Sequence, residues 1–87
     1  MDTLHLILSA ADGERWEKQV CAVTLPTVNG SLGVLHGHAP MLCALREGTV
    51  SCRTAAGESF RIHVSDGIAN VADNQVTLLL SHMKIEE

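Results

Sequence analysis

Apolar residues recur at every second position in several short segments of this chain. In residues 60–64, for example, Phe60, Ile62 and Val64 alternate with Arg61 and His63. Successive side chains of a β-strand point to opposite faces, so this period of two buries one side of each segment. The same pattern predicts strands in residues 4–8, 20–25, 50–53 and 76–80, and one more short strand after residue 80.

Turn-forming pairs separate these segments: Asp12-Gly13, Asn29-Gly30, Glu47-Gly48, Ala56-Gly57, Asp66-Gly67 and Asp73-Asn74. Gly, Asn and Asp adopt the positive φ angles that hairpin turns require. Residues 12–19 lack a sustained apolar stripe, which favours a turn or a strand there over a helix. Short strands at this spacing predict an all-β fold, an antiparallel β-sandwich or barrel.

Length and composition are those of one globular domain over residues 1–87. The chain has 87 residues, of which 46% are apolar and 18% charged. Trp16 and Phe60 are its only aromatic residues, so the core must be aliphatic. Cys21, Cys43 and Cys52 are widely spaced without a CxxC pair, which indicates free, buried thiols in a reducing cytosol.

The charge pattern argues against binding to nucleic acid or directly to lipid. The formal net charge is −4, and the six Lys and Arg residues are scattered. Phosphates would find no basic stripe and bases no aromatic platform, while anionic lipid would be repelled. No apolar run is long enough for a membrane-spanning helix, and residues 4–8 are too short for a signal peptide. Any membrane association is therefore expected through a partner.

Residues 30–40 combine three glycines, two histidines and a proline. Glycine opens backbone angles that other residues avoid, and proline removes a hydrogen-bond donor. We therefore expect a shaped connection between two strands, in which Gly30 and Gly33 allow tight turning and close approach of another backbone. Loops on a rigid scaffold are common contact sites.

Two histidines in this segment raise the question of a metal site. His36 and His38 are two residues apart, but a zinc site needs three or four protein ligands. A third ligand could come from Cys43, Asp66 or His82, although nothing in the sequence brings one of them close. A small metal-binding β module using His36 and His38 is the alternative function. The simpler interpretation makes His38 a polar loop residue at a contact surface.

Other candidate chemistry is weaker. Cys43 and His38 would also need an orienting group and an oxyanion pocket to act as a nucleophile pair. Gly30-x-x-Gly33 lacks the Lys-Ser or Lys-Thr pair and the helix of a phosphate loop. Trp16 is either a contact anchor or, more commonly for such a residue, a packing residue. We predict no catalytic residue, no metal ligand set and no cofactor.

Two motifs resemble the epsilon subunit of rotary F-type ATP synthases. The first is Gly30-x-x-Gly33-Val34-Leu35-x-Gly37-His38-Ala39-Pro40-Met41-Leu42, followed by Leu45-x-x-Gly48. The second is Val64-Ser65-Asp66-Gly67-Ile68-Ala69-x-Val71, followed by Asn74-x-Val76-Thr77-Leu78-Leu79. Residues 4–10 also resemble the first strand of that family, so the resemblance covers nearly the whole chain.

The resemblance implies a ten-stranded antiparallel β-sandwich without catalytic activity. Such a domain would bind the gamma subunit and the c-ring, within a complex that also contains alpha and beta subunits. It would couple ion translocation to ATP synthesis as part of the central stalk, peripheral to the cytoplasmic face of the bacterial cell membrane. The residues that match the gamma-facing side are His38, Ala39, Met41, Leu42, Cys43, Ser65 and Asp66, with Met41 and Leu42 supplying apolar area. Those that match the loop facing the c-ring are Gly30, Ser31, Leu32, Gly33, His36 and Gly37.

The chain departs from the family pattern at several positions. His36 and Glu47 stand where the family usually has proline, Cys21 where it often has an acid, and Ser31 where it often has glutamate. Most family members continue into two C-terminal helices that restrain ATP hydrolysis. The sequence ends before such a helical hairpin, so we expect the sandwich alone and none of this restraint.

Overall fold

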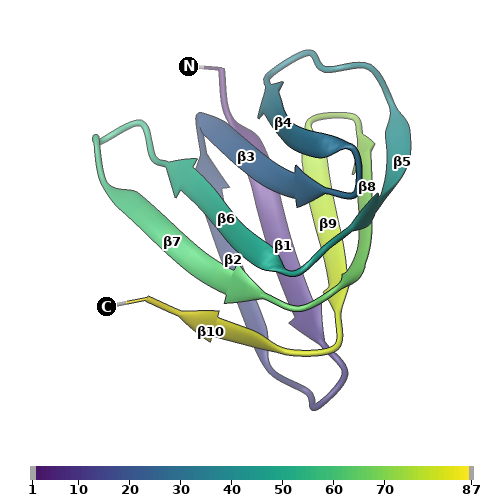
Figure 1. Cartoon of the computed structure of the whole chain (residues 1–87). Coiled ribbons are helices and arrows are strands. Elements are labelled where there is room, and N and C mark those ends of the chain that lie inside the picture. Colours follow the sequence, from purple (N-terminus) through teal and green to yellow (C-terminus); the bar gives the residue numbers. More distant parts are fainter. Residues whose placement is uncertain (1, 87) are drawn as a thin grey trace.

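The computed structural model describes residues 2–86, which form ten β-strands (Figure 1). Among these residues there is no helix, and so none that is long and apolar enough to cross a bilayer. The strands are β1 Leu4–Ala10, β2 Arg15–Val20, β3 Ala22–Thr27, β4 Gly30–Leu35, β5 Met41–Leu45, β6 Gly48–Arg53, β7 Ser59–Val64, β8 Gly67–Ala72, β9 Gln75–Leu80 and β10 Met83–Ile85. The all-β prediction is confirmed.

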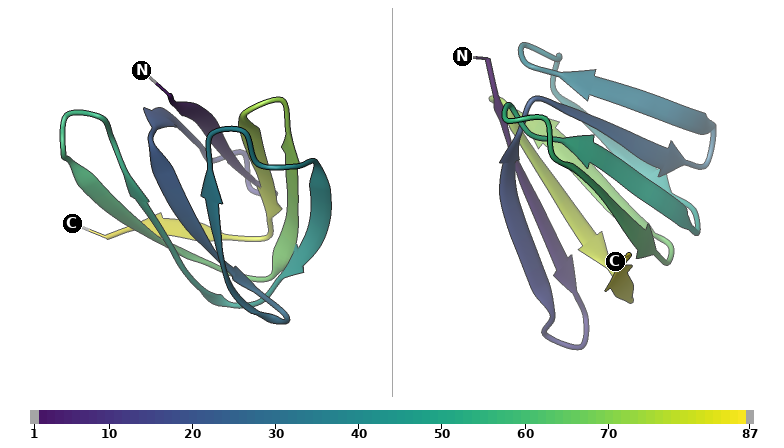
Figure 2. Two further views of the ribbon diagram at one scale, coloured as in Figure 1. Left: turned by 90° about the horizontal axis from the view of Figure 1, so that it is seen from above. Right: turned by 90° about the vertical axis from the view of Figure 1, so that its left-hand side faces the viewer.

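The strands form one sheet that curls into two layers (Figures 1 and 2). One layer runs β4-β3-β6-β7-β10 and the other runs β5-β8-β9-β1-β2. A single pair, Thr27 with Leu45, joins β3 to β5, so the sheet bends sharply there. All pairings are antiparallel except that of β1 with β9, which is parallel. The predicted antiparallel β-sandwich of about ten strands is therefore confirmed, with one parallel pair that the sequence did not predict.

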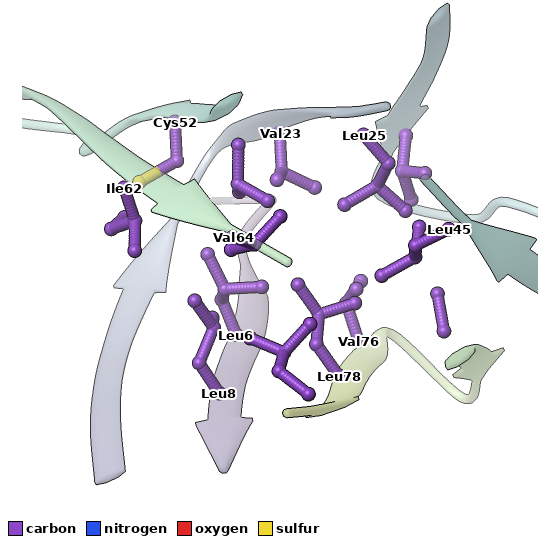
Figure 3. Close-up of a cluster of buried hydrophobic side chains, with 14 of the residues drawn as sticks. Leu6, Leu8, Val23, Leu25, Leu45, Cys52, Ile62, Val64, Val76 and Leu78 are labelled. Atoms are coloured by element: carbon purple, nitrogen blue, oxygen red, sulfur yellow. The ribbon is translucent and has the colours of Figure 1, made fainter. Parts of the chain in front are cut away.

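The core lies between the layers and is aliphatic, as predicted. Leu6, Leu8, Leu78 and Val76 from one layer meet Val23, Ile62 and Val64 from the other (Figure 3). The predicted alternation holds in β1, β6, β7 and β9, where every second residue is buried or half-buried. Burial of this aliphatic surface is the main favourable contribution to folding.

The alternation fails in residues 20–25, which were expected to form one strand. The structure breaks them into β2 and β3 at Cys21, whose N–H donates to the carbonyl of Arg53. The break shifts the phase, so Val20 and then Val23 and Leu25 are buried. Two strands on different layers cannot keep one alternation across the bend.

The segment 30–40 is also not a single connection. Residues Gly30–Leu35 are strand β4, and only residues 36–40 form a loop, which arches from β4 to β5 (Figure 1). Asn74, in the turn between β8 and β9, fixes this loop. Its side-chain oxygen accepts a hydrogen bond from the N–H of Gly37 at 2.7 Å, and its amide nitrogen donates to Nε2 of His36 at 3.1 Å. The loop is therefore anchored even though His36 replaces the usual proline.

Aromatic residues close the side of the sandwich where β2 faces β7. Trp16 on β2 packs edge-to-face on Phe60 of β7, with ring centroids 5.6 Å apart. The Lys18 ammonium lies 4.9 Å from the centre of the Phe60 ring. An inward-pointing lysine on an edge strand also discourages pairing with another chain. Trp16 is therefore a packing residue rather than an exposed contact anchor. Strand β2 also confirms the prediction of a turn or strand, and not a helix, in residues 12–19.

Candidate functional site

The outward side of β5, β8 and β9 carries large apolar side chains. Leu42, Ile68 and Leu79, which we call the outer apolar face, are 72%, 49% and 57% exposed. They point outward because their neighbours along each strand, such as Ala69 and Leu78, point into the core. Exposed apolar residues gathered on neighbouring strands mark contact sites more often than isolated ones do.

The strand register makes this face continuous. Ile68 lies directly opposite Leu79, and Ala44 of β5 lies opposite Ile68. Asn70 and Thr77, also opposite one another, line an open depression together with Leu42, Ile68 and Leu79. None of the five side chains is ionisable. Covering the three apolar ones would contribute roughly 3–4 kcal/mol before association costs. The arrangement can bind an apolar partner and contains no group for chemistry.

A long part of the chain beside this face carries no charge. Residues 19–45 contain no Asp, Glu, Lys or Arg, so all sixteen charged residues lie outside them. This segment includes β3, β4, the 36–40 loop and β5. Because β4 and β5 are the outermost strands of their layers on the same side, neither strand brings a charge to that side of the sandwich. Depletion of charge is typical of the centre of protein interfaces.

Several of the residues expected at the gamma subunit lie along β5, and their side chains point to both faces of this strand. Leu42 points outward, whereas Met41 and Cys43 are half-buried and pack against the core. Met41 and Leu42 therefore lie on opposite sides of β5, because adjacent residues of a strand face opposite sides, and Leu42 offers the more exposed apolar area. His38 and Ala39 precede β5 and lie at the end of the sandwich that carries the 36–40 loop, which we call the loop end.

Ser65 and Asp66 lie at the opposite end of the sandwich. They precede Gly67, which pairs with Leu45 at the far end of β5. The turn between β3 and β4 lies at this end too, because the N–H of Val28 donates to the carbonyl of Ala44. We call it the hairpin end. The gamma-facing set therefore extends over both ends.

The residues expected at the c-ring lie along β4 and just after it, so they also extend over both ends of the sandwich. Gly30 and Ser31 lie at the hairpin end, and His36 and Gly37 follow β4 at the loop end. The expectation of one loop is therefore wrong. The Leu32 side chain packs inward against the core. A Cβ on Gly33 would meet nothing within 4 Å, so no backbone of residues 2–86 approaches it closely.

The two histidines of the loop bind separate partners. Nε2 of His36 accepts from Asn74, and Nδ1 of His38 lies 2.7 Å from the carbonyl oxygen of Ala39. Asp66 and His82, named as possible third ligands, belong to the hairpin end, where the carbonyl of His82 accepts from Ser65. Within residues 2–86, no three His, Cys, Asp or Glu side chains form a group suited to a metal ion.

The cysteines are free but differ in burial. Cys52 is buried, while Cys21 and Cys43 are half-buried, so the expectation of three buried thiols is wrong for two of them. Burial raises the pKa of the Cys43 thiol, which keeps it protonated near neutral pH. A nucleophilic cysteine requires the opposite shift. The structure thus gives no support to a Cys43–His38 nucleophile pair.

Sequence reasoning missed Ile68, Asn70, Thr77 and Leu79. Leu79 lies within the run Leu78-Leu79-Leu80, where an outward leucine resembles its buried neighbours. Two signals were available: the period of two in residues 76–80, which turns Thr77 and Leu79 outward, and the absence of charge from residues 19–45.

Comparisons of this chain with known protein families and with individual proteins agree on one family. The family described as ATP synthase, Delta/Epsilon chain, beta-sandwich domain matches residues 3–84. The ATP synthase epsilon chain of Streptomyces avermitilis is 40% identical over 76 residues, which cover 87% of this chain and 61% of that one. The epsilon chain of Nostoc sp. is 35% identical over 80 residues, which cover 91% and 58%. The chain thus spans about three fifths of the length of these relatives.

Two solved structures share the fold. A chain in the Euglena gracilis mitochondrial ATP synthase structure, which contains OSCP, F1 and the c-ring, superposes with a TM-score of 0.87 at 27% identity. The match covers 95% of this chain and 53% of that one. A chain from the central stalk and c-ring of the Tetrahymena thermophila enzyme has a TM-score of 0.76 at 16% identity, covers 93% and 65%, and shows the fold alone. Together with the sequence matches, this β-sandwich places the chain in the ATP synthase delta/epsilon family.

Proposed function

We propose that this domain is a non-catalytic rotor component of the central stalk of an F-type ATP synthase. It couples ion translocation through the c-ring to ATP synthesis by binding the gamma subunit and the c-ring. The observation that carries the proposal is the outer apolar face, an uncharged docking surface on a domain of this family. The cytoplasmic face of the bacterial membrane is the proposed location, with the membrane reached only through the c-ring.

The gamma subunit binds the outer apolar face in this proposal. Leu42 is its most exposed member and lies on the strand that carries the gamma-facing motif. His38 and Ala39 extend the contact at the loop end. The alpha and beta subunits complete the complex around the stalk.

The c-ring contacts the hairpin end. Gly30 of the ring-facing motif lies there, next to Val28, which is 56% exposed, whereas Ser31 and Gly33 lie further along β4 and are left out of the ring contact. Ser65 and Asp66 share this end, so they belong with the ring contact rather than with the gamma contact. His36 and Gly37 lie at the loop end and are left out of the ring contact.

Transmission of torque requires a stiff body between the two contacts. The domain meets this need because one aliphatic core joins the two layers, and β5 runs from Leu42 of the outer apolar face to Leu45 at the hairpin end. Closely packed protein interiors have low compressibility.

Binding of the purified gamma subunit tests the proposal, with Leu42→Asp as the perturbation. An aspartate at the centre of an apolar contact would be buried without a partner, so affinity should fall by about tenfold to a hundredfold. Ser59→Asp is the matched control, because Ser59 is exposed on the outward side of β7, in the other layer. It should bind like the wild type. A folded wild-type domain that fails to bind the gamma subunit would refute the proposed function.

A further inference from the structure

Strand β4 has a hydrogen-bonded partner on one side only. It pairs with β3 from Gly30 to Leu35, and no strand within residues 2–86 pairs with its other side, which we call the free edge of β4. A free strand edge presents main-chain donors and acceptors to another chain.

The register identifies which main-chain groups lie on the free edge. Ser31 lies opposite Pro26, which has no N–H, and the carbonyl of Pro26 accepts from Arg46 on the other side of β3. Pro26 therefore turns its main chain away from β4, so the hydrogen-bonded pairs with β3 are those of Leu32 and Val34. In an antiparallel ladder the intervening residues point the opposite way. The N–H and C=O groups of Ser31 and Gly33 thus face outward from the sheet.

This edge lacks the features by which β2 and β10, the strands at the two ends of the sheet, avoid pairing. β2 carries Arg15 and Glu17, and β10 is three residues long and carries Lys84. β4 has six residues with neither charge nor proline. The two residues that carry the free main-chain groups, Ser31 and Gly33, are small and exposed. A Cβ on Gly33 would enter open space. Nothing on β4 opposes the approach of another strand.

We propose that the free edge of β4 binds an extended, uncharged segment of the protein that covers the outer apolar face, through main-chain hydrogen bonds to Ser31 and Gly33. The segment is uncharged because residues 19–45 offer no ion-pair partner, and an unpaired charge would be costly to bury. One partner reaches both surfaces because β4 and β5 lie on the same side of the sandwich and the 36–40 loop joins them. Leu35, 61% exposed at the end of β4, supplies an apolar contact beside the added strand. The identity of the partner, the gamma subunit, rests on the proposed function.

Amide hydrogen exchange of the wild-type domain, free and bound to the purified gamma subunit, tests this inference. In the free domain the amides of Leu32 and Val34 should exchange slowly, because they donate to β3, whereas those of Ser31 and Gly33 should exchange fast. In the complex the Ser31 and Gly33 amides should slow by about a hundredfold while Leu32 and Val34 change little. This alternation distinguishes strand pairing from general coverage of the surface.

Gly33→Pro and Gly33→Ala form a matched pair for the same contact. Proline removes the N–H that faces the free edge and is tolerated at such positions of edge strands. Alanine keeps the N–H and adds a methyl group to open space. We expect about tenfold weaker gamma binding for Gly33→Pro and an affinity within twofold of wild type for Gly33→Ala. If Gly33→Pro fails to fold, the exchange experiment on the wild type still decides.

The outcomes separate the two proposals. In one outcome, Leu42→Asp weakens gamma binding but the amides of Ser31 and Gly33 still exchange fast in the wild-type complex. This outcome would overturn the strand-pairing inference and leave the proposed function standing. A folded domain that does not bind gamma would overturn both. Protection of the same two amides in a dimer of the isolated domain would show that a second copy occupies the edge and would overturn the proposed partner.

Discussion

Replacement of Gly67 by alanine should destabilise the domain strongly. Gly67 begins β8, where it pairs with Leu45 on one side and Leu80 on the other. A Cβ at this position would lie 2.2 Å from the carbonyl oxygen of Leu79 and 3.0 Å from Cδ2 of Leu80. The leucine side chain can move, but the carbonyl belongs to β9, so β8 and β9 would have to separate.

The size of the effect follows from that contact. Overpacking of a core by a methyl group typically costs 1–3 kcal/mol, and a clash with backbone belongs at the upper limit, about 3 kcal/mol. For a domain of this size, 1 kcal/mol corresponds to about 4–8 °C in the thermal midpoint, so Gly67→Ala should lower it by about 12–24 °C. Gly33→Ala is the control, and its midpoint should stay unchanged or rise slightly, because alanine also restricts the unfolded chain.

Thermal unfolding followed by far-ultraviolet circular dichroism measures both variants. A Gly67→Ala midpoint within about 3 °C of wild type would refute the reasoning, since it would mean that β8 and β9 do not approach as closely as described. A fall of the predicted size would explain why the motif Ser65-Asp66-Gly67-Ile68 carries glycine at this position.

Three further predictions concern the two faces, the aromatic contact and the buried thiol. Met41→Asp should lower the free energy of unfolding by about 2–3 kcal/mol in urea melts, because Met41 packs against the core. Leu42→Asp should change it by less than about 0.5 kcal/mol, because Leu42 is exposed, and equal effects of the two variants would contradict the assigned faces. Trp16→Ala should cost about 2 kcal/mol through loss of the Phe60 contact, and an unchanged urea midpoint would contradict this packing. Burial raises the pKa of the Cys52 thiol, so at alkaline pH the folded state keeps a proton that the unfolded chain loses. The contribution of this buried thiol to the free energy of unfolding is therefore complete below about pH 9 and is lost as pH rises through the folded pKa. Cys52→Val should therefore lose less stability than wild type between pH 8 and pH 10, and an equal loss in both proteins would contradict the burial of Cys52.

The sequence predicted the strands whose alternation is uninterrupted and missed features that alternation does not encode. Residues 60–64 and 76–80 take the predicted faces because each stays in one layer. The bend at Cys21 was invisible because apolar residues continue through it, and the parallel pairing of β1 with β9 was invisible because a period of two is the same in either direction.

The candidate site was predicted in its location along the chain and not in its geometry. The resemblance drew attention to residues 30–43, which lie on the uncharged side of the sandwich. The glycines of residues 30–33 suggested a loop, but Gly33 has extended backbone in an edge strand. Met41 was grouped with Leu42 because both are apolar, and only the strand direction separates them.

A cryo-electron microscopy map of an ATP synthase assembled with this chain tests the central claim most directly, because it shows what covers Leu42, Ile68 and Leu79. The account predicts that the gamma subunit lies against these three side chains and that the hairpin end meets the c-ring. A map in which the three side chains face solvent while the domain binds through its other layer would contradict it.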